Sequence, residues 1–63
     1  MLMIYGKYKT KKRYSPMDMN SGLPVKNKIY ATMYEDSKKD TLTESLKRLH
    51  EDNPDWSFEL RKA

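Results

Sequence analysis

The sequence contains no cysteine, only two glycines, and no apolar run longer than the five residues Met1–Tyr5. Without thiols, neither a disulfide framework nor a thiolate metal site can stabilise the fold, and the composition fits a reducing compartment. Two glycines are too few for a glycine-rich phosphate loop. The apolar opening is too short for a signal peptide or for a membrane span, which needs about 20 apolar residues. We therefore expect a cytoplasmic protein that does not engage a membrane.

Residues that carry catalysis are equally scarce. The only histidine, His50, has no evident partner that would orient it as a general base. Glu51, Asp52 and Asp55 stand close to it, but adjacent helical residues point in different directions and the spacing matches no known ligand set. No serine has the context of a nucleophile elbow. We expect no enzyme activity, no catalytic or metal-binding residue, no cofactor and no small-molecule substrate.

A chain of 63 residues has room for one domain, which we expect to span residues 1–63. A domain this small buries only about 60% of the surface that its unfolded chain exposes, so nearly every apolar position must face one core. Charged residues make up 35% of the chain and its mean hydropathy is −1.04. Seven aromatic residues and three strongly patterned segments nevertheless separate it from a disordered chain. The sequence therefore predicts a folded domain.

Three segments in the first half are typical of β-strands. Residues 2–9 alternate loosely between two faces and are rich in aromatic and β-branched side chains. Residues 14–18 predict a weaker strand, because Pro16 cannot donate to a ladder. Asparagine, glycine and proline within residues 20–24 predict a turn that folds the chain back on itself. Residues 28–34 carry apolar side chains on both faces and predict a strand in the middle of the sheet.

A helix and a last strand complete the pattern. Thr41–Glu44 has the spacing of a capping box, and Asn53–Pro54 predicts the helix end, with Asn53 in a left-handed cap. Residues 55–61 alternate almost ideally, so their apolar face matches a leucine stripe on the helix. That stripe consists of Leu42, Leu46 and Leu49. The sequence thus predicts an α+β fold, in which one helix packs on one face of a sheet of three or four strands in the order β-β-β-α-β.

Charge is distributed unevenly between the two halves. Residues 1–34 contain seven basic side chains and one acidic, whereas residues 35–63 contain six basic and eight acidic. The net charges of +6 and −2 indicate an anionic partner for the first half. Alternation along a strand would align the cations in a ridge suited to the phosphates of a nucleic acid, with tyrosines beside them for base stacking. The candidate residues are Lys7, Lys9, Lys11, Lys12, Arg13, Lys26 and Lys28, with Tyr8 and Tyr14 for stacking.

The basic segment has other interpretations. Lysine at a sheet edge also prevents edge-to-edge aggregation, and the same charge attracts an acidic protein. Lysine outnumbers arginine here, which favours attraction to a phosphate backbone over readout of bases.

A different function is a protein-interaction module. If the helix covers one face of the strand at residues 28–34, Tyr30 and Tyr34 stand on the open face, where tyrosine is typical of interfaces. An open sheet edge would serve the same purpose. The alternative is that these tyrosines pack against other strands and only stabilise a thin sheet.

Three stretches give the chain a resemblance to a group of small proteins. They are Arg13–Asp18, Asn27–Thr32 and Asn53–Arg61. With these stretches the chain resembles small proteins encoded in phages and prophages of Gram-positive bacteria, and the resemblance covers most of its length. No catalytic signature belongs to it. It implies expression inside a bacterium, where host proteins or nucleic acid are the expected targets.

Overall fold

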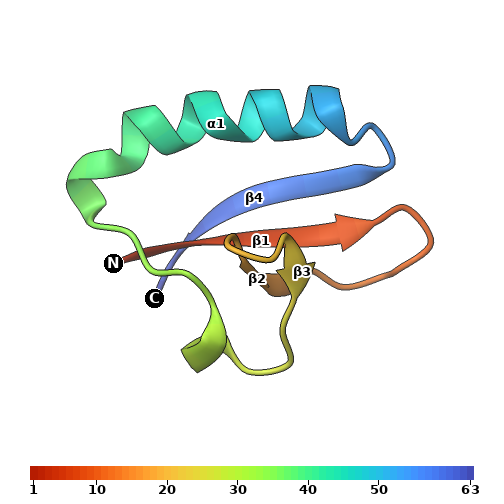
Figure 1. The fold of residues 1–63 in the computed structure, drawn as a ribbon, viewed down its shortest axis with the longest axis horizontal. Coiled ribbons are helices and arrows are strands. Elements are labelled where there is room, and N and C mark those ends of the chain that lie inside the picture. The colour runs from red at the N-terminus through yellow and green to blue at the C-terminus, as the bar shows by residue number, and fades with distance from the viewer.

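The computed structural model describes residues 1–63 as a four-stranded antiparallel sheet with one long helix across it (Figure 1). The elements follow in the order β1 (Leu2–Tyr8), β2 (Ser15–Asp18), β3 (Leu23–Pro24), 3₁₀ turns η1 (Lys28–Tyr30) and η2 (Asp36–Lys38), α1 (Lys39–Asp52) and β4 (Trp56–Lys62). The strands lie side by side in the order β3-β2-β1-β4. The predicted small α+β fold with a single helix is confirmed.

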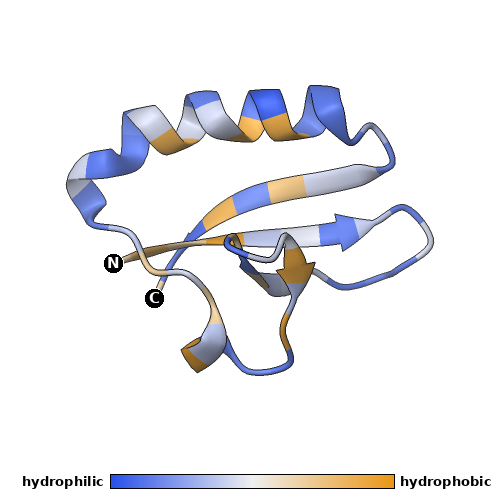
Figure 2. Cartoon of the chain, viewed as in Figure 1, coloured by the Kyte–Doolittle hydropathy of each residue, from blue (hydrophilic) through white to orange (hydrophobic).

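The first and last strands form the centre of the sheet. They pair antiparallel along their whole length, from Leu2 opposite Lys62 to Tyr8 opposite Trp56. Residues opposite each other share a face, so the alternating apolar side chains of β1 and β4 face the helix together. Figure 2 shows the apolar side of α1 turned toward the sheet. The core between the two layers is built from Leu2, Ile4, Met17 and Leu42, with partly buried Leu46, Leu49, Trp56, Phe58 and Leu60 packed around it.

The hairpin of β2 and β3 follows the predicted turn. Asp18 accepts hydrogen bonds from the backbone N–H of Asn20 and from the hydroxyl of Ser21. Gly22 has a φ of 72°, in the left-handed region that glycine adopts without strain. Pro16 is tolerated in this strand because its carbonyl accepts from Val25, on the side away from β1. The N–H that proline lacks would point to the same side, so the ladder with β1 loses nothing.

The predicted strand at residues 28–34 is wrong. Asn27 accepts a hydrogen bond from the backbone N–H of Ile29 and starts the 3₁₀ turn η1 instead. The edge of β1 that a strand at residues 28–34 would join is already paired with β2, through Ser15 and Pro16. Two residues of the segment still bond to the sheet: the N–H of Thr32 donates to the carbonyl of Met17, and the N–H and C=O of Tyr34 exchange hydrogen bonds with Leu2. Aromatic and β-branched composition predicted a strand, but local capping and competition for the sheet position decided otherwise.

The helix has the predicted leucine stripe but not the predicted caps. It begins at Lys39 directly after η2, so Thr41 and Glu44 lie within it and form no capping box. It ends at Asp52, as the sequence predicted from Asn53–Pro54. Asn53 is not left-handed, however. Its φ is −132°, and its side-chain amide donates to the carbonyl of Leu49, which satisfies one of the free carbonyls at the helix end.

The helix is displaced toward one edge of the sheet. It contacts β4, the edge strand, more than the central strand β1. At its C-terminal end, His50 Nδ1 donates to the carbonyl of Trp56 over 2.9 Å. This bond fixes the imidazole proton on Nδ1, because a carbonyl can only accept. Because the helix is displaced toward β4, it leaves part of the sheet surface over β1 and β2 uncovered on the same face. The helix is too short and too polar to cross a lipid bilayer.

The backbone of Gly6 lies close to core side chains of the neighbouring strands. A Cβ there would lie 3.0 Å from Met17 Sδ and 3.2 Å from Phe58 Cδ1. Gly6→Val is therefore expected to lower the free energy of unfolding by about 1–3 kcal/mol, the usual cost of overpacking a core. Urea denaturation followed by Trp56 fluorescence measures this. Ser57→Val, an exposed position on β4, is the control and should change stability by less than about 0.5 kcal/mol. Equal stability of Gly6→Val and the wild type would show that the core yields easily.

The amino terminus gives the fold a weak dependence on pH. The ammonium of Met1 lies 3.0 Å from Asp36 Oδ1, and its hydrogen bond and charge lower the pKa of Asp36 below the ordinary 3.8. Since the folded-state pKa is the lower one, the stabilisation is complete above the unfolded pKa and disappears as the pH falls through the folded pKa. Asp36→Asn should therefore be slightly less stable than the wild type at neutral pH and equally stable in strong acid. A difference in urea midpoint that does not change with pH would contradict this.

Candidate functional site

The basic segment after β1 forms a loop and not a ridge. The strand ends at Tyr8, whose carbonyl accepts from the N–H of Lys11 and so begins a turn. The predicted alignment of four cations along one strand face is therefore wrong. Figure 1 shows the loop of residues 9–14 extending beyond one end of the sheet. The chain folds this way because a run of charged side chains gains nothing from continuing into a buried ladder.

This loop borders a hollow of about 570 Å³ at the end of the sheet. Four of the predicted basic residues line it together with two aromatic residues, and we call it the basic hollow. Its lining consists of Gly6, Lys7, Tyr8, Lys11, Lys12, Arg13, Ser15, Pro24 and Trp56. The structure thus brings a subset of the sequence candidates to one place, through the loop rather than through strand alternation.

The cations of the basic hollow have no carboxylate partner. No ion pair involves Lys7, Lys11, Lys12 or Arg13. Lys9 differs, because its ammonium lies 3.4 Å from Asp55 and is neutralised there. The Lys7 ammonium lies 5.3 Å from the centre of the Tyr14 ring, a cation–π distance, and so stands on the face of the sheet away from the helix. The loop cations are exposed, and their charge is available to an anion.

The aromatic residues at the hollow are Tyr8 and Trp56. Their rings meet edge to face, with centroids 5.7 Å apart, and Trp56 stacks in turn on Phe58 at 6.1 Å. Trp56 is partly exposed, so one side of this aromatic row reaches the hollow. The sequence predicted Tyr8 as a stacking partner but treated Trp56 only as core. The pairing of Trp56 with Tyr8 across β1 and β4 was the missing information.

Three other candidates lie elsewhere. Tyr14 is on the opposite face of the sheet, where the guanidinium of Arg61 lies 5.5 Å from its ring centre. Lys26 and Lys28 are exposed but do not line the hollow. They follow β3 into the segment drawn below the sheet in Figure 1, away from the loop of residues 9–14. Lys26 and Lys28 were predicted to join the other cations at one nucleic-acid site, and the structure does not bring them there.

The two candidate interface tyrosines do not share a face. Tyr30 belongs to η1 and is 69% exposed beside Ile29, which is 67% exposed. Tyr34 is partly buried and packs against the core. The open tyrosine face predicted for residues 28–34 is absent because those residues form no strand.

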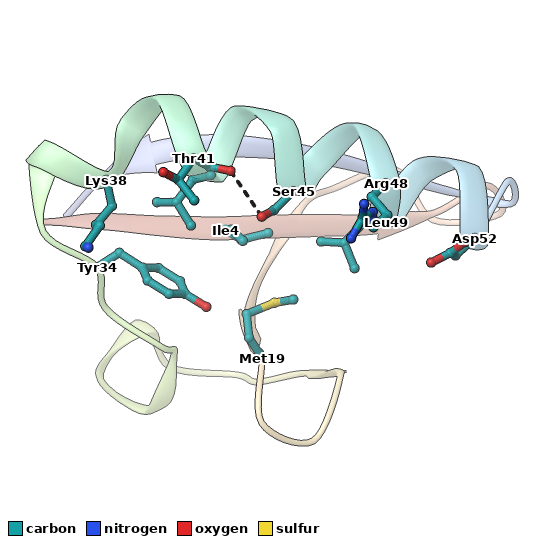
Figure 3. A pocket seen from close by; sticks show the side chains of 10 residues that line it. Ile4, Met19, Tyr34, Lys38, Thr41, Ser45, Arg48, Leu49 and Asp52 are labelled. Carbon is teal, nitrogen blue, oxygen red and sulfur yellow. Dashed lines mark hydrogen bonds between the residues drawn. The ribbon is translucent and has the colours of Figure 1, made fainter.

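Tyr34 instead forms one wall of an apolar groove. Figure 3 shows its ring and the side chain of Met19 across from α1, with Ile4 on β1 behind them. The groove has a volume of about 540 Å³. Its remaining lining comes from η2 and one side of α1, namely Lys38, Thr41, Leu42, Ser45, Arg48, Leu49 and Asp52. The displacement of α1 toward β4 is what leaves this groove open.

The electrostatics of the basic hollow can be tested with ionic quenchers of Trp56, the only tryptophan. Because unpaired cations surround it, iodide is expected to quench its fluorescence more than caesium does. Reversing two charges with Lys11→Glu and Lys12→Glu balances the two remaining cations and should abolish that preference, while neutral acrylamide quenches both proteins alike. Equal quenching by iodide and caesium in the wild type would show that the cations do not act at the hollow.

No family model, no curated protein and no solved structure matches this chain. The resemblance to small phage proteins stays a prediction. Function is therefore inferred from the geometry and charge of the basic hollow and of the apolar groove.

Proposed function

We propose that the protein binds single-stranded nucleic acid, without enzyme activity, through the basic hollow. One observation carries this proposal: three exposed cations with no carboxylate partner, Lys11, Lys12 and Arg13, line a hollow that also contains the partly exposed ring of Trp56. Cations that follow a backbone and aromatic rings that stack on bases are the two components of sequence-independent recognition of single strands.

The composition of the hollow favours the backbone over the bases. Three of its four cations are lysines, which act as point charges toward phosphate, whereas bidentate readout of guanine is typical of arginine. No α-helix borders the hollow, so there is no element that would enter the major groove of a duplex. An unpaired strand fits better, because its bases are free to turn toward Trp56.

The strength and the salt dependence follow from the number of contacts. Three phosphate contacts on a single strand, from the exposed loop cations Lys11, Lys12 and Arg13, give a slope of about −2 for the logarithm of the association constant against the logarithm of salt concentration. Lys9 contributes little because Asp55 neutralises it. The bacterial setting implied by the phage resemblance supplies such strands during replication and transcription.

The decisive experiment compares two pairs of charge reversals by fluorescence anisotropy with a labelled oligothymidylate. Lys11→Glu with Lys12→Glu is expected to weaken binding about tenfold or more at low salt, and to reduce the salt slope by about 1.4. Lys39→Glu with Lys47→Glu changes the net charge equally on the helix and should leave binding within about threefold.

Two outcomes would contradict the proposal. Equal loss in both pairs would mean that net charge alone attracts the oligonucleotide. Binding that does not change with salt would exclude phosphate contacts as its source. Polyglutamate is the competitor for the alternative partner: if it displaces the oligonucleotide at equal charge concentration, an acidic protein becomes the better assignment.

A further inference from the structure

The apolar groove beside α1 is a second surface, and its lining residues differ from those of the basic hollow. We propose that it receives an amphipathic helix of another protein, one that carries acidic residues beside its apolar stripe. This inference does not rest on nucleic-acid binding, because the two surfaces share no residue.

The groove is built like a site for apolar side chains. Ile4 and Leu42 lie buried at its base, and its accessible apolar surface comes from the partly exposed side chains of Leu49, Met19 and Tyr34, the last two on the wall opposite the helix (Figure 3). Methionine and tyrosine adapt to different shapes, and both are common where proteins meet. The volume of about 540 Å³ lies within the usual range of pockets that bury a ligand. The groove runs from Lys38, at the end of η2, along α1 to Asp52, and the 14 residues of α1 correspond to about 21 Å of helix.

The hydrogen bonds around the groove favour a helix over an extended peptide. An added strand would need free backbone N–H and C=O groups along one wall. The backbone of α1 is bonded within the helix, both backbone groups of Tyr34 bond to Leu2, and the N–H of Met19 donates to the hydroxyl of Thr32. The walls therefore offer side chains to a ligand. The occupant must form its backbone hydrogen bonds within itself, as a helix does.

The charged residues at the rim of the groove determine which charges the polar face of the partner helix should carry. Lys38 and Arg48 line the groove and take part in no ion pair. Their cations complement acidic residues that flank an apolar stripe. Asp52, also unpaired, lies at the other end of the groove from Lys38. A helix dipole places its negative C-terminus near Lys38 and its positive N-terminus near Asp52, so the partner should lie antiparallel to α1.

A second copy of this chain does not fit the same description. The leucine stripe of its own α1 is occupied by the core. Each copy also has a net charge of +4, so two copies repel each other. The occupant is therefore a helix from a different protein.

The test uses a short capped peptide with leucines at i, i+4 and i+7 of a helix and glutamates on both flanks. Amide chemical-shift mapping on the labelled protein is expected to place it at Met19, Tyr34 and the groove side of α1. Arg48→Glu should weaken binding about tenfold, because a cation opposite glutamate becomes a repelling anion. Lys47→Glu, the adjacent residue outside the groove, is the matched control and should change binding less than threefold. Ser45→Arg, which fills the groove from an exposed helix position, should abolish binding.

Each other result overturns the proposal. No shift at millimolar peptide, or equal binding of a peptide with lysine in place of glutamate, would exclude an acidic helix. Equal effects of Arg48→Glu and Lys47→Glu would place the peptide elsewhere. Shifts at the same residues with dodecanoate, in the absence of peptide binding, would assign the groove to an aliphatic anion. A mass that doubles with concentration in sedimentation equilibrium, together with loss of that doubling in Ser45→Arg, would assign it to a second copy.

Discussion

The antiparallel pairing of β1 with β4 is the interaction on which the rest of the structure depends. It joins the two ends of the chain along seven residue pairs and aligns their apolar faces under α1. A domain of 63 residues has little surface to bury, and here the most buried side chains, Met3 and Ile4, belong to β1. β2 and Tyr34 bind to the other edge of β1, so every part of the sheet is positioned through this one strand.

The two candidate surfaces are consequences of how α1 sits on that pair. The strands extend past the C-terminal end of the helix, and the row of Tyr8, Trp56 and Phe58 is thereby left partly open beside the basic loop. On its other side, the shift of α1 toward β4 leaves the groove between the helix and the residues Met19 and Tyr34, above the buried side chains of Ile4 and Leu42. A sheet with a second helix would have covered both regions. Both surfaces therefore remain open because a domain this small has only one helix to cover its sheet.

Much of the fold could be predicted from periodicity. The leucine stripe of α1 and the alternation from Trp56 to Leu60 are strong signals because their spacing repeats over several residues. The segment from Lys28 to Tyr34 misled for a physical reason: Asn27 caps a 3₁₀ turn, and β2 already fills the neighbouring sheet position. Composition reports what a segment prefers alone and not whether the sheet has room for it.

The candidate site was predicted in part for similar reasons. The loop cations could be named because charge does not depend on strand register, but the alignment of Lys9 with Asp55 and the exclusion of Lys26 and Lys28 depend on which strands pair. Trp56 was assigned to the core because its role at the hollow arises only from its position opposite Tyr8. The groove left no signal at all, since it results from the placement of the helix on the sheet.

The pairing of the first strand with the last also governs how the protein is made. During synthesis, β1 can pair with β2 and with Tyr34 once those residues have emerged, but its longest pairing, with β4, must wait for residue 62. The sheet formed in that interval contains only β1 and the short strands β2 and β3, and so small a sheet without a helix is marginal in water. Completion of the core is therefore a late event, and until then the edge of β1 that binds β4 stays unpaired.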